Sequence, residues 1–183
     1  MIRTCLAILG LALLAAFALQ AQNAPANPLS TEAQQAWNRT IGNAIAAAGK
    51  MPEENYSYKP FPESMSFRDI VAHTADSAMG ACSAFNGERK TAGAAQMQKK
   101  DELVGALKAA QAECEKAYGG LTDAKAVEMV AGRGSSRSRL STLWGNTVHI
   151  EHEYAQMAVH LRMKGIVPPS SEGRGGMGGR GGR

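Results

Sequence analysis

The stretch that decides the fold is NTVHIEHEYAQMAVHLRMKGIVPPSS, residues 146–171. Apolar residues recur in it at the three- and four-residue spacing of a helix. Gly165 followed by Pro168 and Pro169 marks where this helix ends, because glycine suits a left-handed cap and proline cannot continue a helix. Three of the four histidines of the chain also lie here. The stretch therefore raises two questions: what the helix packs against, and whether its histidines bind a metal.

Three further long helices are predicted before this one, because the body of the chain is rich in Ala, Glu, Lys, Gln and Met and has few β-branched runs. Thr31 and Gln34 have the spacing of a capping box, and Ser66 is the predicted cap of the second helix. The four helices are expected near residues 30–49, 66–87, 95–118 and 138–164. Long connections precede the second and the last of them, and 131–139 is polar and rich in Gly and Ser. This order predicts an all-α antiparallel four-helix bundle with at least one crossover connection.

The N-terminal end has the features of a secretory signal peptide over residues 1–21. Arg3 precedes a short apolar run, and small residues suit cleavage after Ala18 or Ala21. The run is shorter than the ~20 residues that a membrane span needs. We therefore expect a periplasmic or secreted protein without membrane attachment after cleavage, with one domain over residues 23–171.

The C-terminal end, residues 172–183, reads EGRGGMGGRGGR. Such a Gly- and Arg-rich segment buries too little to hold a packed element, so we expect a disordered tail. Arg-Gly-Gly tails can bind single-stranded nucleic acid, but export argues against that partner. Without Arg3, Glu172 and the three tail arginines, basic and acidic residues are almost equal in number. The net charge of +4 therefore indicates no nucleic-acid partner.

Two cysteines, Cys82 and Cys114, remain once Cys5 leaves with the signal peptide. An even pair in an oxidising compartment is a candidate disulfide. The alternative is two buried thiols on neighbouring helices. Export favours the disulfide.

Two faces can be drawn on the last helix when it is projected at about 100° per residue. The expected core face holds Leu140, Leu143, Trp144, Tyr154, Ala158 and Leu161. A second stripe, nearly opposite, holds His149, Glu153, Gln156 and His160. Histidines opposite an apolar face are usually solvated, so the periodicity alone favours an exposed stripe without a function.

The same spacing also permits a metal site. His149 and Glu153 lie four residues apart, so their side chains project over one patch. His73, on the second helix, would complete a set of two imidazoles and one carboxylate. Such a set can hold a divalent ion and leave coordination positions open.

Two segments of the chain, taken together, resemble the DinB family of metal-binding helical bundles. They are MSFRDIVAHTADSAMGACSAFNGE, residues 65–88, and LWGNTVHIEHEYAQMAVHLRMKGIVPPSS, residues 143–171. The first has a histidine early in the helix and then an Ala-Asp step, and the second has a histidine-rich helix with a Gly-x-x-Pro-Pro end. The resemblance implies an up-down-down-up four-helix bundle, often dimeric, with a metal held by three histidines in an open cleft.

The resemblance places the ligands on His73 and His149, but the third falls on Glu153, where relatives often have histidine. His152 and Glu153 look exchanged. Glu153 could serve directly, His152 could swing in from about 100° round the helix, or the metal could have been lost.

Three polar residues flank these positions. Gln156 and His160 would support or line the cleft, or else lie on the surface as ordinary polar groups. Asp76, one turn from His73, could orient that imidazole. Its alternative is a solvated acid on a polar face.

The family includes metal-dependent thiol transferases and a mycothiol-dependent isomerase. The resemblance thus implies an enzyme of transferase or hydrolase type that uses a divalent metal (Zn, Ni, Fe or Mn) on a small-molecule substrate that the residues do not identify. It also implies a homodimer. The alternative is a secreted, non-catalytic bundle braced by Cys82 and Cys114 that binds a small ligand or a partner.

Overall fold

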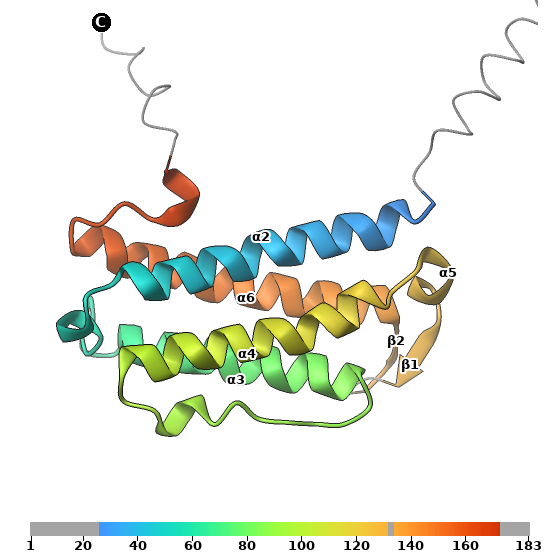
Figure 1. Cartoon of the computed structure of the whole chain (residues 1–183), viewed down its shortest axis with the longest axis horizontal. Coiled ribbons are helices and arrows are strands. Elements are labelled where there is room, and N and C mark those ends of the chain that lie inside the picture. The colour runs from blue at the N-terminus through green and yellow to red at the C-terminus, as the bar shows by residue number, and fades with distance from the viewer. Residues whose placement is uncertain (1–25, 132–133, 173–183) are drawn as a thin grey trace, which may run out of the picture.

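The computed structural model of the chain describes residues 26–131 and 134–172. Four long helices form a bundle (Figure 1): α2 (Pro28–Lys50), α3 (Phe67–Phe85), α4 (Lys100–Gly119) and α6 (Arg139–Met163). Helix α6 packs against α2 and α3, and α4 packs against the same two helices. Helices α2 and α3 therefore lie diagonally opposite each other in the bundle. The predicted all-α four-helix bundle is confirmed.

The direction of the helices matches the up-down-down-up order. Helices α2 and α6 run one way through the bundle, and α3 and α4 run the other way (Figure 1). Because α3 and α4 are parallel neighbours, the chain between them must return along the bundle. A crossover is therefore present, but it lies between the second and third helices and not in the long links before the second and the last helix, from which it was predicted. This return carries the short helix η2 (Ala94–Gln96), and the link before α3 carries η1 (Glu53–Asn55).

Local signals fix the start of α3 and the end of α6. The Ser66 side chain accepts a hydrogen bond from the Asp69 backbone N–H, as an N-cap does. Gly165, with φ +71°, adopts the left-handed conformation that ends α6. Both predictions from the sequence are confirmed.

The start of α2 differs from its prediction. The helix begins at Pro28, and Asn27 precedes it without a side-chain cap. Instead, the Asp123 carboxylate of the short helix α5 (Asp123–Ala126) accepts from the backbone N–H groups of Leu29 and Ser30 at 3.2 and 2.8 Å. The predicted capping box at Thr31 is therefore wrong, because Thr31 already lies in the first turn and donates its backbone N–H to the Asn27 carbonyl oxygen at 3.0 Å.

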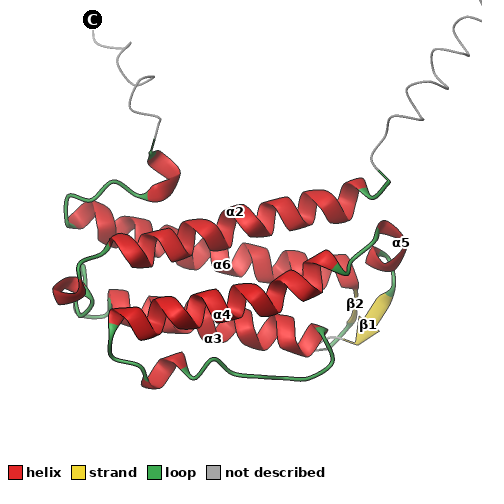
Figure 2. Cartoon of the chain, viewed as in Figure 1, coloured by secondary structure: helices red, strands yellow, loops and turns green. Residues whose placement is uncertain are grey.

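A small antiparallel hairpin precedes α6 where the sequence analysis expected an irregular polar connection. Strand β1 (Met129–Ala131) pairs with β2 (Ser136–Ser138), as the yellow arrows of Figure 2 show. Each strand has three residues and neither buries a face. A hairpin this short and exposed leaves no alternating apolar pattern in the sequence, which explains why it was missed. A last short helix, η3 (Pro169–Ser171), follows α6.

The core lies between the four helices and has an aromatic centre. The Trp37 and Tyr118 rings stack at a centroid separation of 5.0 Å, and the Tyr118 hydroxyl donates to the Leu143 carbonyl oxygen at 2.7 Å. These contacts tie α2, α4 and α6 together. The predicted signal peptide and the tail from Gly173 onward lie outside the described residues. Within the described part of the chain, no helix has the length and apolar character to span a bilayer.

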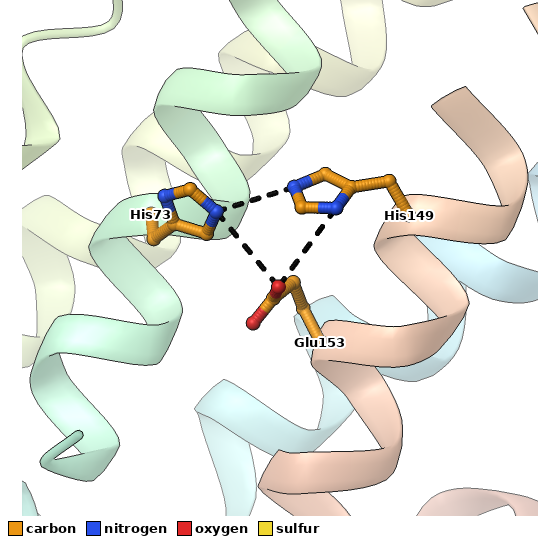
Figure 3. Close-up of side chains that lie close together, drawn as sticks. All are labelled: His73, His149 and Glu153. Carbon is orange, nitrogen blue, oxygen red and sulfur yellow. Dashed lines mark hydrogen bonds and ion pairs between the residues drawn. The ribbon is translucent and has the colours of Figure 1, made fainter. Parts of the chain in front are cut away.

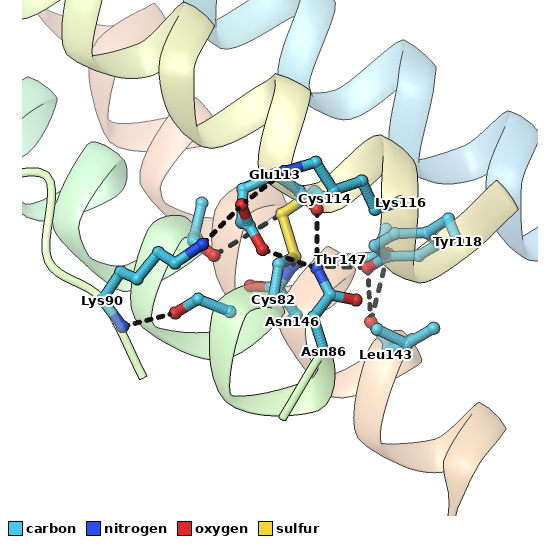
Figure 4. Close-up of a disulfide and its surroundings, with 12 residues drawn as sticks. Cys82, Asn86, Lys90, Glu113, Cys114, Lys116, Tyr118, Leu143, Asn146 and Thr147 are labelled. Atoms are coloured by element: carbon cyan, nitrogen blue, oxygen red, sulfur yellow. Dashed lines mark hydrogen bonds and ion pairs between the residues drawn. A yellow bond between two sulfur atoms is a disulfide. The ribbon is translucent and has the colours of Figure 1, made fainter. Parts of the chain in front are cut away.

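A disulfide joins α3 to α4 (Figure 4). Cys82 and Cys114 are both fully buried and bonded to each other, so the predicted pairing is present in the structure. Beside it, Glu113 accepts hydrogen bonds from the Asn86 amide at 2.7 Å and from the Lys116 ammonium at 3.0 Å. These two contacts lower the pKa of Glu113 to about 2. The contact between the parallel helices α3 and α4, called the α3–α4 seam below, is thus stabilised by one disulfide and by one carboxylate whose two oxygens both accept hydrogen bonds.

Candidate metal centre

Three side chains from two helices, α3 and α6, converge where these helices lie side by side (Figure 3). His73 of α3 and His149 of α6 approach with their Nε2 atoms 3.2 Å apart. Glu153, one turn further along α6, places Oε1 3.8 Å from His73 Nε2 and 3.9 Å from His149 Nδ1. The packing of α3 against α6 brings these residues together although His73 and His149 are 76 positions apart in the sequence.

The three groups differ in depth. The Glu153 side chain is 6% exposed, whereas the His73 and His149 side chains are 45% and 41% exposed. The carboxylate therefore forms the floor of the site and the two imidazoles form its rim. Both imidazoles are therefore partly open to solvent.

The donor set fits a divalent metal ion. With one donor atom from each residue, all three lie within 4.8 Å of one another. Two ligands of one tetrahedral ion, bound at roughly 2.0–2.2 Å, lie about 3.3 Å apart. The separations of Glu153 Oε1 from the imidazoles are too long for hydrogen bonds, but they are near what shared coordination needs. The three residues could therefore hold an ion and leave further positions open.

Two neighbours complete the surroundings of the cluster. Gln156 donates from Nε2 to Glu153 Oε2 at 2.9 Å, which leaves Oε1 turned toward the imidazoles. The Ser77 hydroxyl lies 3.4 Å from His73 Nε2, on the next turn of α3. Gln156 thus supports the carboxylate, as one of its two predicted roles requires. Ser77 was missed, although its four-residue spacing from His73 could have identified it.

The comparisons with known proteins agree with this fold. Residues 36–157, which include all three cluster residues, match the sequence model of the DinB superfamily. The chain belongs to this superfamily. Its structure is similar to the crystal structure of a DinB-like protein from Bacillus cereus ATCC 10987, with a TM-score of 0.63 and 18% identity over 75% of this chain and 93% of that one. That likeness shows the fold alone. None of the curated protein sequences matches this chain.

Asp76 has a different role in this DinB superfamily protein from the one predicted. Its carboxylate accepts from the Thr91 hydroxyl at 3.0 Å and from the backbone N–H groups of Ala94 and Ala95 at 3.2 and 3.0 Å. Both oxygens are thus engaged with the return segment between α3 and α4. Asp76 fastens that segment to α3 and does not orient His73.

His160 lies inside the DinB-like bundle, not in a solvated stripe. It is 4% exposed, and its ring nitrogens lie 2.9 Å from the Gln156 carbonyl oxygen and 3.2 Å from the Met65 carbonyl oxygen. The ring therefore ties α6 to the link before α3. His152, by contrast, is exposed on the outer side of α6 and is not in the cluster.

The core face of α6 is rotated from its prediction. Most of the predicted core face is buried as expected: Leu143, Tyr154, Ala158 and Leu161. Trp144, however, is 51% exposed, and Glu153 and His160 are buried. The buried side also includes Asn146, whose amide donates toward Tyr118 at 3.3 Å. Polar residues with partners across the bundle occupy part of the interior, so a projection based on large apolar residues placed the core face too far round the helix.

Proposed function

We propose that this protein is a metal-dependent enzyme of transferase or hydrolase type, which holds one divalent ion between His73, His149 and Glu153. The observation that carries the proposal is the convergence of two half-exposed imidazoles on one oxygen of a buried carboxylate. An ionised carboxylate in a buried position needs a compensating partner, and a cation between these three groups supplies it. Zinc, nickel, iron and manganese all suit such a donor set.

Each residue of the proposed site has its own role in binding the metal or admitting the substrate. Glu153 brings negative charge to the floor of the site, and Gln156 holds its outer oxygen so that Oε1 points at the imidazoles. His73 and His149 form an open rim through which a substrate enters. A bound divalent ion would act as a Lewis acid and lower the pKa of a thiol or water on the open side.

We place this activity outside the cytoplasm. The Cys82–Cys114 disulfide supports that location, because such bonds persist mainly in oxidising compartments. The apolar stretch before residue 21 supports it as well.

Elemental analysis tests the proposal on protein purified from the periplasm without chelator and without a histidine tag. We expect about one metal ion per chain in the wild type, and loss of this ion in His149→Ala and in Glu153→Ala. His152→Ala is the matched control, because His152 lies on the same helix outside the cluster and its variant should keep the ion.

Two outcomes would contradict this assignment. If His152→Ala also loses the ion, His152 takes part in the site and the set of three ligands is wrong. If the wild type holds no metal even after zinc, nickel and manganese are supplied, the non-catalytic bundle that binds a small ligand or partner becomes the better description. A metal-loaded protein would next be assayed on an activated ester and on thiol addition to an electrophile, against His149→Ala.

A further inference from the structure

A pocket lies between the first turns of α2 and α6, at the end of the bundle where both helices begin (Figure 1). Its volume is about 350 Å³. Small-molecule sites in proteins have volumes of about 300–1,000 Å³, so this pocket is large enough for a small organic ligand. The pocket and the His73, His149 and Glu153 cluster share no residue. It is therefore a separate candidate site.

The wall of the pocket is mainly apolar. Leu29 of α2 and Trp144 of α6 both line it and are 50% and 51% exposed. Ala33 and Ser141 also line it, and their side chains are too short to fill the space between two neighbouring helices. The pocket thus offers half-exposed apolar surface to a molecule from solvent, and part of this surface is an indole ring.

The charge that the pocket presents is negative. Among the described residues that line it, Glu32 is the only charged one. Its side chain is exposed, and none of the ion pairs between described residues involves it. This carboxylate is therefore available to a cation from outside the chain.

The positive end of the α2 dipole does not offset this negative charge. The Asp123 carboxylate already accepts from the backbone N–H groups of Leu29 and Ser30 at 3.2 and 2.8 Å. Its negative charge offsets the positive end of the helix dipole. Because Leu29 lines the pocket, Asp123 also lies close to it. An anionic ligand would therefore be repelled by Glu32 and Asp123, whereas a cationic ligand would be attracted by both.

The start of α6 leaves the same charge balance. The Ser138 hydroxyl accepts from the Ser141 backbone N–H at 3.1 Å, so the chain itself caps this helix. The nearest arginine along α6 is Arg139, whose guanidinium lies over the Phe85 ring of α3 at 4.5 Å from its centroid. That contact turns the guanidinium toward α3, and α3 contributes no residue to the pocket.

We propose that this pocket binds a small organic ammonium ion with a flat apolar body. The body lies against Leu29 and Trp144, and the ammonium group lies near the Glu32 carboxylate. Tryptophan attracts cations over its ring more strongly than the other aromatic side chains, so Trp144 favours the charged end as well. The Ser141 hydroxyl oxygen can accept a hydrogen bond from the ammonium group. This site does not depend on the proposed metal.

Titration of the exported protein with phenethylammonium tests the proposal. Tryptophan fluorescence reports binding, because Trp37 is fully buried and Trp144 is half exposed in the pocket. A chelator in the buffer prevents the amine from binding to a metal at the histidine cluster. We expect a saturable change in emission, and at least about tenfold weaker binding of phenylpropionate, which has the same apolar body but a negative charge.

Two variants test the assigned contacts. Glu32→Gln should bind phenethylammonium about three- to fivefold more weakly, which is the effect of losing an exposed ion pair. Glu115→Gln is the matched control, because Glu115 is an exposed acid of α4 outside the pocket. Trp144→Ala should bind at least about tenfold more weakly and Trp144→Phe much as the wild type does, both measured by calorimetry because they lack the fluorescent reporter.

Three results would overturn the proposal. They are the absence of saturable binding at millimolar phenethylammonium, equal or tighter binding of phenylpropionate, and an unchanged affinity in Glu32→Gln. Trp144 emission that shifts with protein concentration, and not with the amine, would mean that a protein surface covers the pocket, and would overturn it too. None of these results bears on the proposed metal site, whose metal content is measured separately and without chelator.

Discussion

Two buried glutamates on different sides of the bundle show how the same side chain serves different purposes. Glu113 lies at the α3–α4 seam and Glu153 between α3 and α6, and they are 7% and 4% exposed. Glu113 accepts from Asn86 and Lys116 through its two oxygens. Glu153 accepts from Gln156 through one oxygen only, and its other oxygen faces two imidazoles beyond hydrogen-bonding distance.

The difference indicates which carboxylate supports the fold and which could bind a ligand. At Glu113 the chain itself supplies every contact that an ionised carboxylate needs, so the group braces the seam. At Glu153 the chain supplies a hydrogen bond to one carboxylate oxygen, and the other oxygen faces the imidazoles of His73 and His149. A buried carboxylate with one paired oxygen and one oxygen facing histidines is therefore a better marker of a site than burial alone.

Replacement of Glu153 should give the largest effect. Glu153→Gln keeps the size of the side chain but removes its charge, so we expect loss of stoichiometric metal binding with a change in the apoprotein's free energy of unfolding below about 1 kcal/mol. Elemental analysis and urea denaturation measure the two quantities. Glu113→Gln is the control and should keep its metal. If both variants keep the ion, the contrast between the two carboxylates has no functional meaning.

Removal of the disulfide should give the next largest effect, on stability alone. Cys82 and Cys114 are 32 positions apart, and closing a loop of that length lowers the entropy of the unfolded chain enough to stabilise the fold by about 3–4 kcal/mol. Denaturation of a Cys82→Ala, Cys114→Ala double variant against the oxidised wild type measures this. Its metal content should not change, and a loss of metal would show that the α3–α4 seam controls the geometry of the proposed metal site between α3 and α6.

Loss of the Gln156 amide should weaken metal binding without abolishing it. Gln156→Leu removes the donor to Glu153 Oε2, so the carboxylate is no longer held toward the imidazoles. We expect the metal affinity to fall by 10- to 100-fold, which is about 1.4–2.7 kcal/mol. Competition with a metal-binding dye measures the affinity. An unchanged value would mean that the geometry of Glu153 does not depend on Gln156.

The smallest expected effect is the pH dependence of the Glu113 seam. The pKa of this carboxyl is lowered from 4.5 to about 2 in the folded protein. A lowered pKa stabilises the fold fully above the unfolded value, and this contribution is lost as the pH falls from about 4.5 toward 2. The difference in Tm between wild type and Glu113→Gln should therefore shrink over that window.

Glu115→Gln is the control for this pH experiment, because Glu115 lies on the exposed side of α4. Its Tm should follow that of the wild type at each pH. A difference between wild type and Glu113→Gln that stays constant from pH 7 to pH 3 would contradict the assigned role of the carboxylate.

The elements with strong local signals could be predicted from the sequence. Ser66 marks the start of α3, and Gly165 with the prolines after it marks the end of α6, because caps and breakers act on their own turn of the helix. The start of α2 could not be predicted in this way. Its backbone donors are satisfied by Asp123, which is 93 residues away from Ser30, and no local pattern contains that information.

The site could be predicted only in part. The four-residue spacing of His149 and Glu153 pairs them on one patch, and His73 on the second helix was the expected third ligand, which the resemblance also gives. The depth of Glu153 and His160 could not be predicted, since polar residues enter the interior only where a partner from another element meets them. The same limitation applies to Asp76, whose partners lie on the return segment.

The placement of the ligands on α3 and α6 has a consequence for how the protein would acquire its metal. His73 and His149 are 76 positions apart, so the unfolded chain does not hold the proposed ligands together. The ion would be taken up only where the bundle forms. The affinities of such a site for these metals overlap, so metal availability decides which one binds. The metals present in the compartment where the protein folds would therefore determine which ion it holds.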